Sequence, residues 1–309
     1  MILSRKMLKT LFIFTLFVLT SQTSLQAKSG CGTEGIWLQV LGSGGPEFDD
    51  GRASSGYVIW HNGKARILID MGTGSLFNFE QSGASLNDLD VILMSHFHVD
   101  HSNDLPGLIK ASFFSDRNRD LPLYGPTGNQ LMPSATKFVQ ALFGSSGAFH
   151  YLNSYLDGTD SYQLLPYDVE ASSKTAKEVM ANSSYRITAV PVHHGPIPSL
   201  AWRVEIEGKK LVFSGDMNND NDTLTSLATS ANLLVAHHAV PEEVVGVARN
   251  LHMPPSIIGK IAAKAKVKQL LLSHRMNRTL GREKISTGII RRAYKGPLFF
   301  AEDLKCLRP

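Results

Sequence analysis

The sequence lacks a long apolar run, internal repeats and a clear excess of charge, and its 309 residues include only two cysteines. Its longest apolar stretch, residues 11–18, is about half of the roughly 20 residues that span a bilayer, which excludes a multi-span membrane protein. Three of the 31 Lys and Arg residues lie in the first 27 positions, where no Asp or Glu occurs, so 28 basic residues face 27 acidic ones in the rest of the chain. This balance gives no electrostatic case for nucleic acid as the main partner.

The first 27 residues have the three-part pattern of a secretory signal peptide. Arg5, Lys6 and Lys9 precede the apolar stretch, and a polar segment then ends at Ala27. We therefore expect cleavage near Ala27, a secreted or periplasmic protein without stable membrane insertion, and a mature chain of residues 28–309. A lipidated N-terminal cysteine is a second interpretation, which the charged Lys28 disfavours.

The two cysteines lie near opposite ends of the mature chain, Cys31 at its start and Cys306 at its end. Because thiols pair in an oxidising compartment, export favours a disulfide between them. The alternative is two unpaired thiols, since the sequence does not show whether the Cα atoms come within bonding distance.

Short apolar runs alternate with amphipathic stretches without a linker, which predicts one domain. We predict strands at residues 36–41, 57–60, 65–69, 91–94, 121–124, 185–192, 201–206, 210–213, 233–235, 269–272 and 297–299, and helices at 130–143, 256–266 and 282–294. Asn62 and Gly63 supply the positive φ of a hairpin turn. This mixture indicates helices packed outside sheets. Residues 145–184 are polar and irregular, and we expect them to be an insertion over the site.

Nine of the eleven histidines follow apolar runs, a clustering that scattered surface histidines would not show. The densest group is HFHVDH at residues 96–101, directly after the predicted strand 91–94. In an extended or turning backbone His96 and His98 project to one side, and the turn directs Asp100 and His101 to a second point nearby. Imidazole nitrogens and carboxylate oxygens are ligands that Zn²⁺ and similar divalent ions accept. The motif therefore predicts a metal site rather than a polar loop with chance histidines.

Two metals need more ligands than this motif supplies, and three later apolar runs also stop at a potential ligand. The first ends at His193 and His194, the second leads to Asp216, and the third leads to His274. Ligands at the ends of buried strands predict a site at the edge of the sheets. For Asp216 the alternative is a turn or cap residue, which the other groups make less favoured.

These motifs identify the chain as similar to the metallo-β-lactamase fold hydrolases, in the subgroup with ribonuclease Z, secreted arylsulfatases and small phosphodiesterases. The resemblance covers residues 36–301 and includes LGSGGP at 41–46, RASS at 52–55, the HxHxDH block, LPGL at 105–108, YGP at 124–126, SGD at 214–216 and SH at 273–274. It implies an α+β fold, a single-domain four-layer αβ/βα sandwich with two divalent ions at one edge. Zinc is the first expectation for these ions, and manganese or iron are the alternatives.

The resemblance also implies the roles of the ligands. His96, His98 and one of the two adjacent histidines would hold the first ion, Asp100, His101 and His274 the second, and Asp216 would bridge them. We favour His194 over His193, because family members commonly place glycine after this ligand, as Gly195 is here, and because strand alternation would turn His193 the other way. An aspartate at the bridging position points away from true β-lactamases and towards the ester-hydrolysing branches.

Two positions depart from ribonuclease Z. Its His-Glu-Ala-Thr signature corresponds to HHAV at 237–240, so His238 stands where that family has glutamate. His252 matches the position of the family's proton-transfer histidine, although not its neighbours. We predict Asp100, His252 and His238 as catalytic residues, with His252 first and His238 second as proton donor. The alternatives are a solvated helix neighbour for His252 and hydrogen bonding without chemistry for His237 and His238.

The substrate prediction rests on what the insertion lacks. Ribonuclease Z binds tRNA through a basic arm, whereas residues 145–184 have two lysines against five acidic residues. The insertion has five aromatic residues that either wall a pocket for a ring-bearing substrate or pack a lid: Phe149, Tyr151, Tyr155, Tyr162 and Tyr167.

We therefore predict an exported dinuclear-metal hydrolase that cleaves a small phosphodiester or sulfate ester by attack of a metal-bridging hydroxide. Its partner would be a small-molecule ester, no nucleic acid is expected, and a homodimer is left open. The alternatives are a ribonuclease Z-like endoribonuclease and a lactone or thioester hydrolase. A non-enzymatic metal-binding protein is least favoured, because no ligand position is lost.

Overall fold

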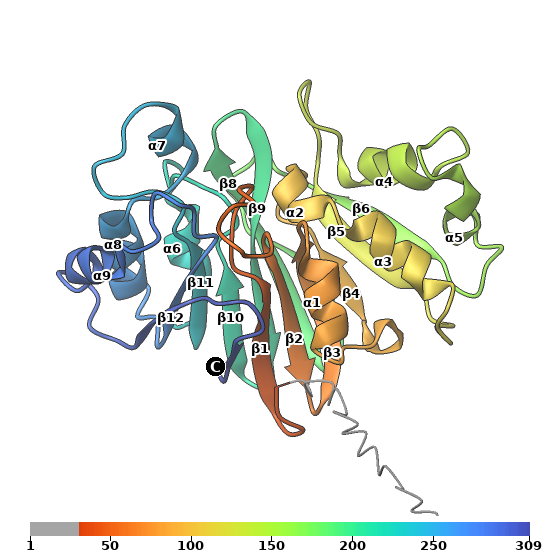
Figure 1. The fold of residues 1–309 in the computed structure, drawn as a ribbon, viewed down its shortest axis with the longest axis horizontal. Coiled ribbons are helices and arrows are strands. Elements are labelled where there is room, and N and C mark those ends of the chain that lie inside the picture. Colours follow the sequence, from red (N-terminus) through yellow and green to blue (C-terminus); the bar gives the residue numbers. More distant parts are fainter. Residues whose placement is uncertain (1–30) are drawn as a thin grey trace, which may run out of the picture.

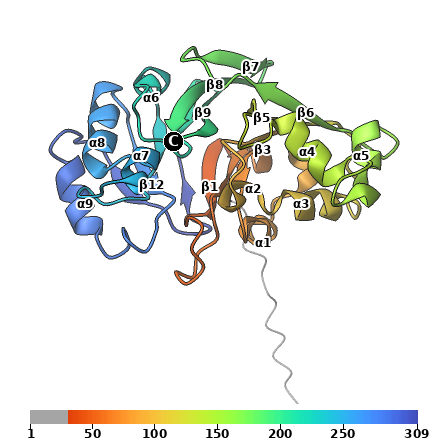
Figure 2. The same cartoon turned by 90° about the horizontal axis from the view of Figure 1, so that it is seen from above.

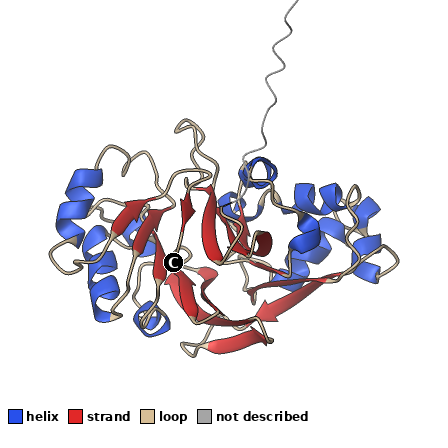
Figure 3. Ribbon diagram, turned by 90° about the horizontal axis from the view of Figure 1, so that it is seen from below, coloured by secondary structure: helices blue, strands red, loops and turns tan. Residues whose placement is uncertain are grey.

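The computed structural model describes residues 31–309, and the expected signal peptide lies outside these residues. The strands form two seven-stranded sheets, ordered β14-β1-β2-β3-β4-β5-β6 and β13-β12-β11-β10-β9-β8-β7 (Figure 1). The sheets lie face to face, and helices cover the outer face of each (Figures 2 and 3). The fold is the four-layer αβ/βα sandwich that the resemblance implies.

The first sheet contains β1 (Ile36–Gly42), β2 (Gly56–His61), β3 (Lys64–Met71), β4 (Val91–Leu93), β5 (Leu121–Pro126), β6 (Leu164–Val169) and β14 (Cys306–Leu307). The second contains β7 (Lys177–Ala181), β8 (Tyr185–His194), β9 (Ile197–Ile206), β10 (Lys209–Phe213), β11 (Leu233–His237), β12 (Leu270–Ser273) and β13 (Leu298–Phe300). The helices are α1 (Ser75–Gln81), α2 (Val99–Ser102), α3 (Leu105–Ser112), α4 (Ala135–Phe143), α5 (Ser154–Asp157), α6 (Thr223–Leu227), α7 (Val247–Leu251), α8 (Pro255–Lys264) and α9 (Glu283–Ile290).

Three apolar layers stabilise the sandwich. The middle layer lies between the sheets and includes Leu38 and Ile59 from the first sheet and Trp202 and Phe213 from the second. The outer layers lie between each sheet and its helices, with α1, α3 and α4 on one side and α6, α8 and α9 on the other. Strand alternation explains this division, since Leu38 of β1 belongs to the middle layer and Leu41 to the helix side.

Every predicted strand is present, and Asn62 and Gly63 have the positive φ expected of the hairpin between β2 and β3. The main difference among the helices is at α4, which begins at Ala135 instead of residue 130. Ser134 caps this helix, because its Oγ accepts a hydrogen bond from the Lys137 amide.

Residues 145–184 differ from the predicted irregular insertion. They contribute β6, which pairs in parallel with β5, and β7, which pairs antiparallel with β8, so this segment completes one edge of each sheet. Tyr155 and Tyr162 are buried in the helix-side core of the first sheet, and Tyr167 stacks on Tyr124 with 4.9 Å between ring centroids. Tyr155 and Tyr162 therefore pack the domain, whereas Tyr167 is 42% exposed.

The expected disulfide between Cys31 and Cys306 is confirmed, with 5.6 Å between the two Cα atoms. It lies where β14, near the end of the chain, pairs with β1. Within residues 31–309 we find no helix of the length and apolarity needed to cross a bilayer.

Candidate metal centre

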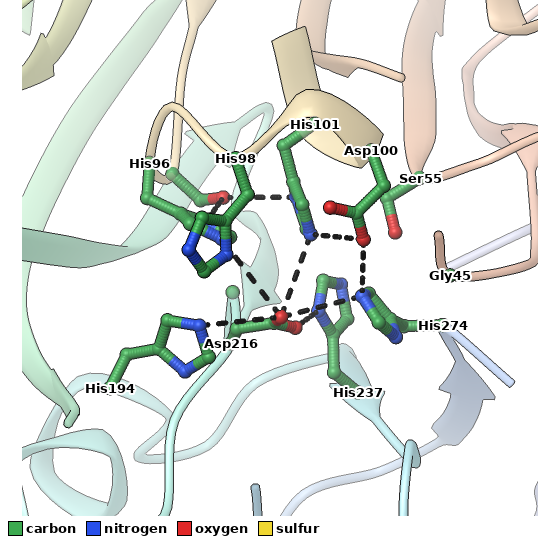
Figure 4. A network of polar contacts seen from close by, with 12 residues as sticks. Gly45, Ser55, His96, His98, Asp100, His101, His194, Asp216, His237 and His274 are labelled. Atoms are coloured by element: carbon green, nitrogen blue, oxygen red, sulfur yellow. Dashed lines mark hydrogen bonds and ion pairs between the residues drawn. The ribbon is translucent and has the colours of Figure 1, made fainter. Parts of the chain in front are cut away.

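The histidine-rich motifs meet at one edge of the sandwich, and both sheets contribute to the cluster (Figure 4). The segment 96–101 follows β4 of the first sheet and forms the loop and short helix α2. In the second sheet His194 ends β8, Asp216 follows β10, His237 ends β11 and His274 follows β12. The strands β10, β11 and β12 are parallel, so their carboxyl ends present these side chains at the same edge.

Two groups of side chains could each hold a metal ion, and Asp216 belongs to both. The first group comprises His96, His98, His194 and Asp216, and the second comprises His101, Asp216, His237 and His274. Within each group, one donor atom per residue lies within 4.8 Å of the others. A carboxylate shared by two groups of imidazoles can bridge two cations.

One oxygen of Asp216 is the centre of this arrangement. Its Oδ2 lies 3.3 Å from His274 Nε2, 3.6 Å from His101 Nε2, 3.7 Å from His194 Nε2 and 3.9 Å from His96 Nε2. Asp100 completes the side near His101 and His274, because its Oδ2 lies 3.5 Å and 3.1 Å from their Nε2 atoms.

The donor atoms fit a pair of divalent ions. In the described part of the chain, Nε2 of His101 and of His194 is buried without a hydrogen-bond partner. The opposite nitrogen of each ring is fixed, because His194 Nδ1 donates to the Leu251 carbonyl over 2.9 Å and His101 Nδ1 donates to Asp70 Oδ2 over 2.8 Å. Metal-ligating histidines are typically held in this way, with the second nitrogen turned towards the metal.

Three histidines of the cluster and Asp216 have the protonation states that metal binding needs, whereas the neighbouring carboxylates raise the pKa of His101 and His274. Burial lowers the pKa of His96, His98 and His194, which leaves these rings neutral with a free lone pair. Burial alone would raise the pKa of Asp216, but the surrounding His274, His252 and His101 hold it well below its usual value. Asp216 is therefore a carboxylate at neutral pH.

Two glycines allow the backbone to approach the cluster closely. A Cβ at Gly72 would lie 2.1 Å from the Asp100 carbonyl oxygen, and one at Gly45 would lie 2.9 Å from the ring of His274. Any larger residue would displace these two ligands. Gly45 of the LGSGGP motif thus lies against the ring of His274, and Gly72 lies against the backbone of the HxHxDH motif.

Most of the predicted site residues lie in the cluster. Among them are His96, His98, Asp100, His101, His194, Asp216 and His274. His193, the alternative to His194, points away from it, as strand alternation predicts, and its Nδ1 lies 3.8 Å from Asp220 Oδ2. His252 lies beside the cluster, with Nδ1 3.9 Å from Asp216 Oδ2.

The structure places His238, which the sequence predicts to be catalytic, outside the cluster. Its Nε2 lies 3.0 Å from Ser286 Oγ of α9, and its ring packs near Phe300. His237 and His238 are successive residues at the end of a strand, so they point to opposite sides, and His237 is the one that faces Asp216. Burial, with the nearby charge of Arg275, lowers the pKa of His238 to about 3, which makes it a neutral core residue.

Two residues of the centre, Asp70 and His237, were missed as site residues. Asp70 follows the buried run 65–69, which is the same pattern that identified Asp216. His237 was noticed only as a hydrogen-bonding residue, and its Nδ1 donates to Asp216 Oδ1 over 2.7 Å. Applying the strand-end rule to every apolar run would have found both.

The chain is similar in sequence to a known family and to proteins with established names. The family model described as beta-lactamase superfamily domain matches residues 65–275. A protein named ribonuclease Z from Mycolicibacterium paratuberculosis is 26% identical over 282 residues, which cover 87% of this chain and 96% of that protein.

Solved structures share the fold. The metallo-beta-lactamase fold protein YhfI from Bacillus subtilis superposes with a TM-score of 0.68 at 20% identity, over 89% of this chain and 100% of that one. The short form of human tRNase Z superposes with a TM-score of 0.67 at 19% identity, over 88% of this chain and 98% of that one.

Proposed function

Because the chain belongs to the beta-lactamase superfamily, we propose that it is an exported two-metal hydrolase that cleaves small phosphodiesters or sulfate esters. The observation that carries the proposal is the position of Asp216 Oδ2 between two groups of imidazole nitrogens. That arrangement suits two cations separated by one bridging carboxylate, which is a common design for hydrolysis of phosphate and similar esters.

The residues present can supply the ligands for both ions. His96, His98 and His194 would hold one, Asp100, His101 and His274 the other, and Asp216 would hold both. When bound, such ions lower the pKa of a water molecule, so that hydroxide is available near neutral pH. Asp70 and the Leu251 carbonyl keep His101 and His194 oriented for this task.

We infer that His252 gives a proton to the departing oxygen. Its ring lies 5.4 Å from that of His194 and 5.7 Å from that of His274, measured between centroids, and its Nδ1 lacks a hydrogen-bond partner in residues 31–309. Burial lowers its pKa to about 3 against the opposing effect of Asp216. An anionic ester would bring a negative charge that favours the protonated ring, which a neutral lactone would not.

Exposed apolar side chains beside the cluster support an organic group on the substrate. Val99 lies between two cluster residues and is 68% exposed, while Val245 and Val247 are 81% and 76% exposed at the start of α7. The last residue of α7, Leu251, holds His194. Val99 and the Leu251 end of α7 therefore lie next to the metal centre, and we infer that the exposed valines contact an apolar substituent of the substrate.

A ribonuclease Z-like activity is the second candidate, because the similarity to ribonuclease Z spans nearly the whole length of that protein. Residues 145–184 argue against it, since they have five acidic residues against two lysines and are built into β6 and β7 instead of forming a basic arm. Export would also separate the protein from precursor tRNA.

A substrate panel tests the proposal. Zinc-loaded protein is assayed on bis(p-nitrophenyl) phosphate, p-nitrophenyl sulfate, a cyclic nucleotide, a lactone, a thioester, a β-lactam and a precursor tRNA. We expect the phosphodiesters or the sulfate ester to be cleaved fastest, with loss of that activity in Asp216→Ala. Preference for tRNA would establish the second candidate, and two bound ions without turnover would indicate a metal-binding protein.

Export is tested separately, by expressing the full chain in a bacterium and analysing the periplasmic fraction by mass spectrometry. The expected product begins at or near residue 28. Full-length protein confined to the cytoplasm would contradict this part of the proposal.

A further inference from the structure

His237 faces the metal centre, yet both of its ring nitrogens already have partners. Its Nδ1 donates to Asp216 Oδ1 over 2.7 Å, and its Nε2 lies 3.1 Å from the Tyr57 hydroxyl. The Nε2 atoms of His101 and His194, in contrast, have no hydrogen-bond partner among the described residues. His237 therefore differs from His101 and His194, because neither of its ring nitrogens is without a hydrogen-bond partner.

The hydrogen bond from His237 makes the two oxygens of Asp216 inequivalent. Oδ1 accepts this bond, whereas Oδ2 is the oxygen within 3.3 to 3.9 Å of the nitrogens of His274, His101, His194 and His96. Without the bond to Oδ1, rotation of the carboxylate could bring either oxygen to the centre.

We propose that His237, oriented by Tyr57, is a positioning residue that holds Oδ1 of Asp216 and so presents Oδ2 alone to both ions. The inference rests on the proposed metal centre, but it does not depend on which ester is the substrate.

The hydrogen-bond directions follow from the chemistry of the groups. A carboxylate only accepts, so His237 carries its proton on Nδ1, and the remaining Nε2 accepts from the Tyr57 hydroxyl. The Tyr57 oxygen also lies 2.8 Å from Ser273 Oγ, which fixes its position next to the His274 ligand.

This chain of contacts crosses the sandwich. Tyr57 lies on β2 of the first sheet and is completely buried in the middle layer, whereas His237 and Asp216 belong to the second sheet. The orientation of the bridging carboxylate is thereby coupled to the packing of the two sheets.

Three variants at two positions test the proposal, with one control variant for each position. His237→Asn keeps an N–H donor near the position of Nδ1, His237→Leu removes it, and Tyr57→Phe removes only the hydroxyl. His238→Asn alters the adjacent histidine, which faces Ser286, and Tyr162→Phe removes a buried hydroxyl that is likewise 2.8 Å from a serine oxygen, Ser112 Oγ. Zinc stoichiometry, zinc affinity by chelator competition and the visible spectrum of the cobalt-substituted protein are measured.

We expect His237→Leu and Tyr57→Phe to weaken binding of at least one ion by about 10- to 100-fold, the usual effect of losing a partner that orients a ligand. His237→Asn should recover most of this affinity and keep the cobalt spectrum, and both controls should bind like the wild type. If His237→Asn loses an ion and alters the spectrum as His237→Leu does, His237 is a ligand and the proposal is wrong. Unchanged affinity in Tyr57→Phe would also overturn it. A wild-type protein that does not bind two ions would instead refute the proposed function.

Discussion

Asp70 and His101 are joined by a hydrogen bond of 2.8 Å that directs the opposite side of the imidazole ring towards Asp216. The same carboxylate accepts hydrogen bonds from the amide and the hydroxyl of Ser95, each 2.7 Å long. Asp70 therefore connects β3 to the loop that follows β4 and fixes the first residues of the metal-binding motif. Its neighbouring charge, together with that of Asp100, also holds the pKa of His101 well above its usual value, against the effect of burial.

Replacing Asp70 with Asn should weaken metal binding although Asp70 touches no ion. We expect a loss of about 10- to 100-fold in zinc affinity, because the ring of His101 would no longer be held by a carboxylate. Chelator competition measures the effect, with the exposed Asp157→Asn as control. Equal affinities of Asp70→Asn and wild type would show that the hydrogen bond is dispensable.

Asp216→Ala should lose at least one of two bound ions, because two nearby cations repel each other and a shared carboxylate screens that repulsion. Metal analysis after gel filtration measures the stoichiometry. Asp222→Ala, at an exposed position after β10, is the control. Two tightly bound ions and unchanged activity in Asp216→Ala would mean that the site assignment is wrong.

His252→Ala should slow the hydrolysis of alkyl esters by about 10²- to 10⁴-fold, as expected for loss of a general acid. Nitrophenyl esters should be nearly unaffected, since nitrophenolate leaves without a proton. The rates of both substrate types are compared with those of His193→Ala, and metal content is checked in parallel. An equal loss on both substrates would assign His252 to substrate positioning or metal support instead.

The buried His238 makes stability depend on pH. Its pKa is about 3 in the folded protein and about 6.5 when unfolded, so the unfolded state binds the proton more strongly between these values. The contribution of His238 to the free energy of unfolding is therefore complete above pH 6.5. It decreases by about 1.4 kcal/mol for each pH unit as the pH falls towards 3. Urea unfolding between pH 7 and 4 gives the free energy of unfolding of the metal-free wild type and of His238→Asn, and we expect it to fall more steeply with decreasing pH in the wild type. The same pH dependence in both proteins would contradict this prediction.

Removing the disulfide by Cys31→Ser and Cys306→Ser together should lower the free energy of unfolding by about 2–5 kcal/mol. The bond closes a loop of 275 residues, so the unfolded chain gains many conformations when it is lost. Thermal unfolding with and without reductant measures the effect. A wild-type protein whose unfolding is insensitive to reductant would show that the bond contributes little.

The sequence predicts the secondary structure correctly where the pattern of apolar and turn residues is clear. The central strands are continuous apolar runs, and the turn at Asn62 and Gly63 requires a positive φ that few residues adopt. The sequence does not predict the edge strands β6 and β7, because buried and exposed residues do not alternate along either of them. Such strands form because a neighbouring strand offers free backbone groups, which is a tertiary effect.

The residues of the site likewise divide into those that the sequence predicts and those that it does not. The HxHxDH block and the strand-end residues could be recognised from spacing and residue type, and alternation correctly separated His194 from His193 in space. Alternation also separates His237 from His238: the resemblance to ribonuclease Z favours His238, whereas His237 is the one that faces Asp216. The role of Tyr57 was beyond reach, because its contact with His237 joins residues 180 positions apart in different sheets.

The bond between Cys31 and Cys306 also determines how the oxidised protein responds to a mechanical load. A pulling force applied before Cys31 and after Cys306 passes through the sulfur atoms and bypasses the strands between them. A motor that unfolds proteins by threading them from one end would have to draw two segments of the disulfide-closed polypeptide through its pore together. Otherwise it would have to wait until the disulfide is reduced. Oxidation thus makes the domain resistant to unfolding from its termini, a property separate from its thermodynamic stability.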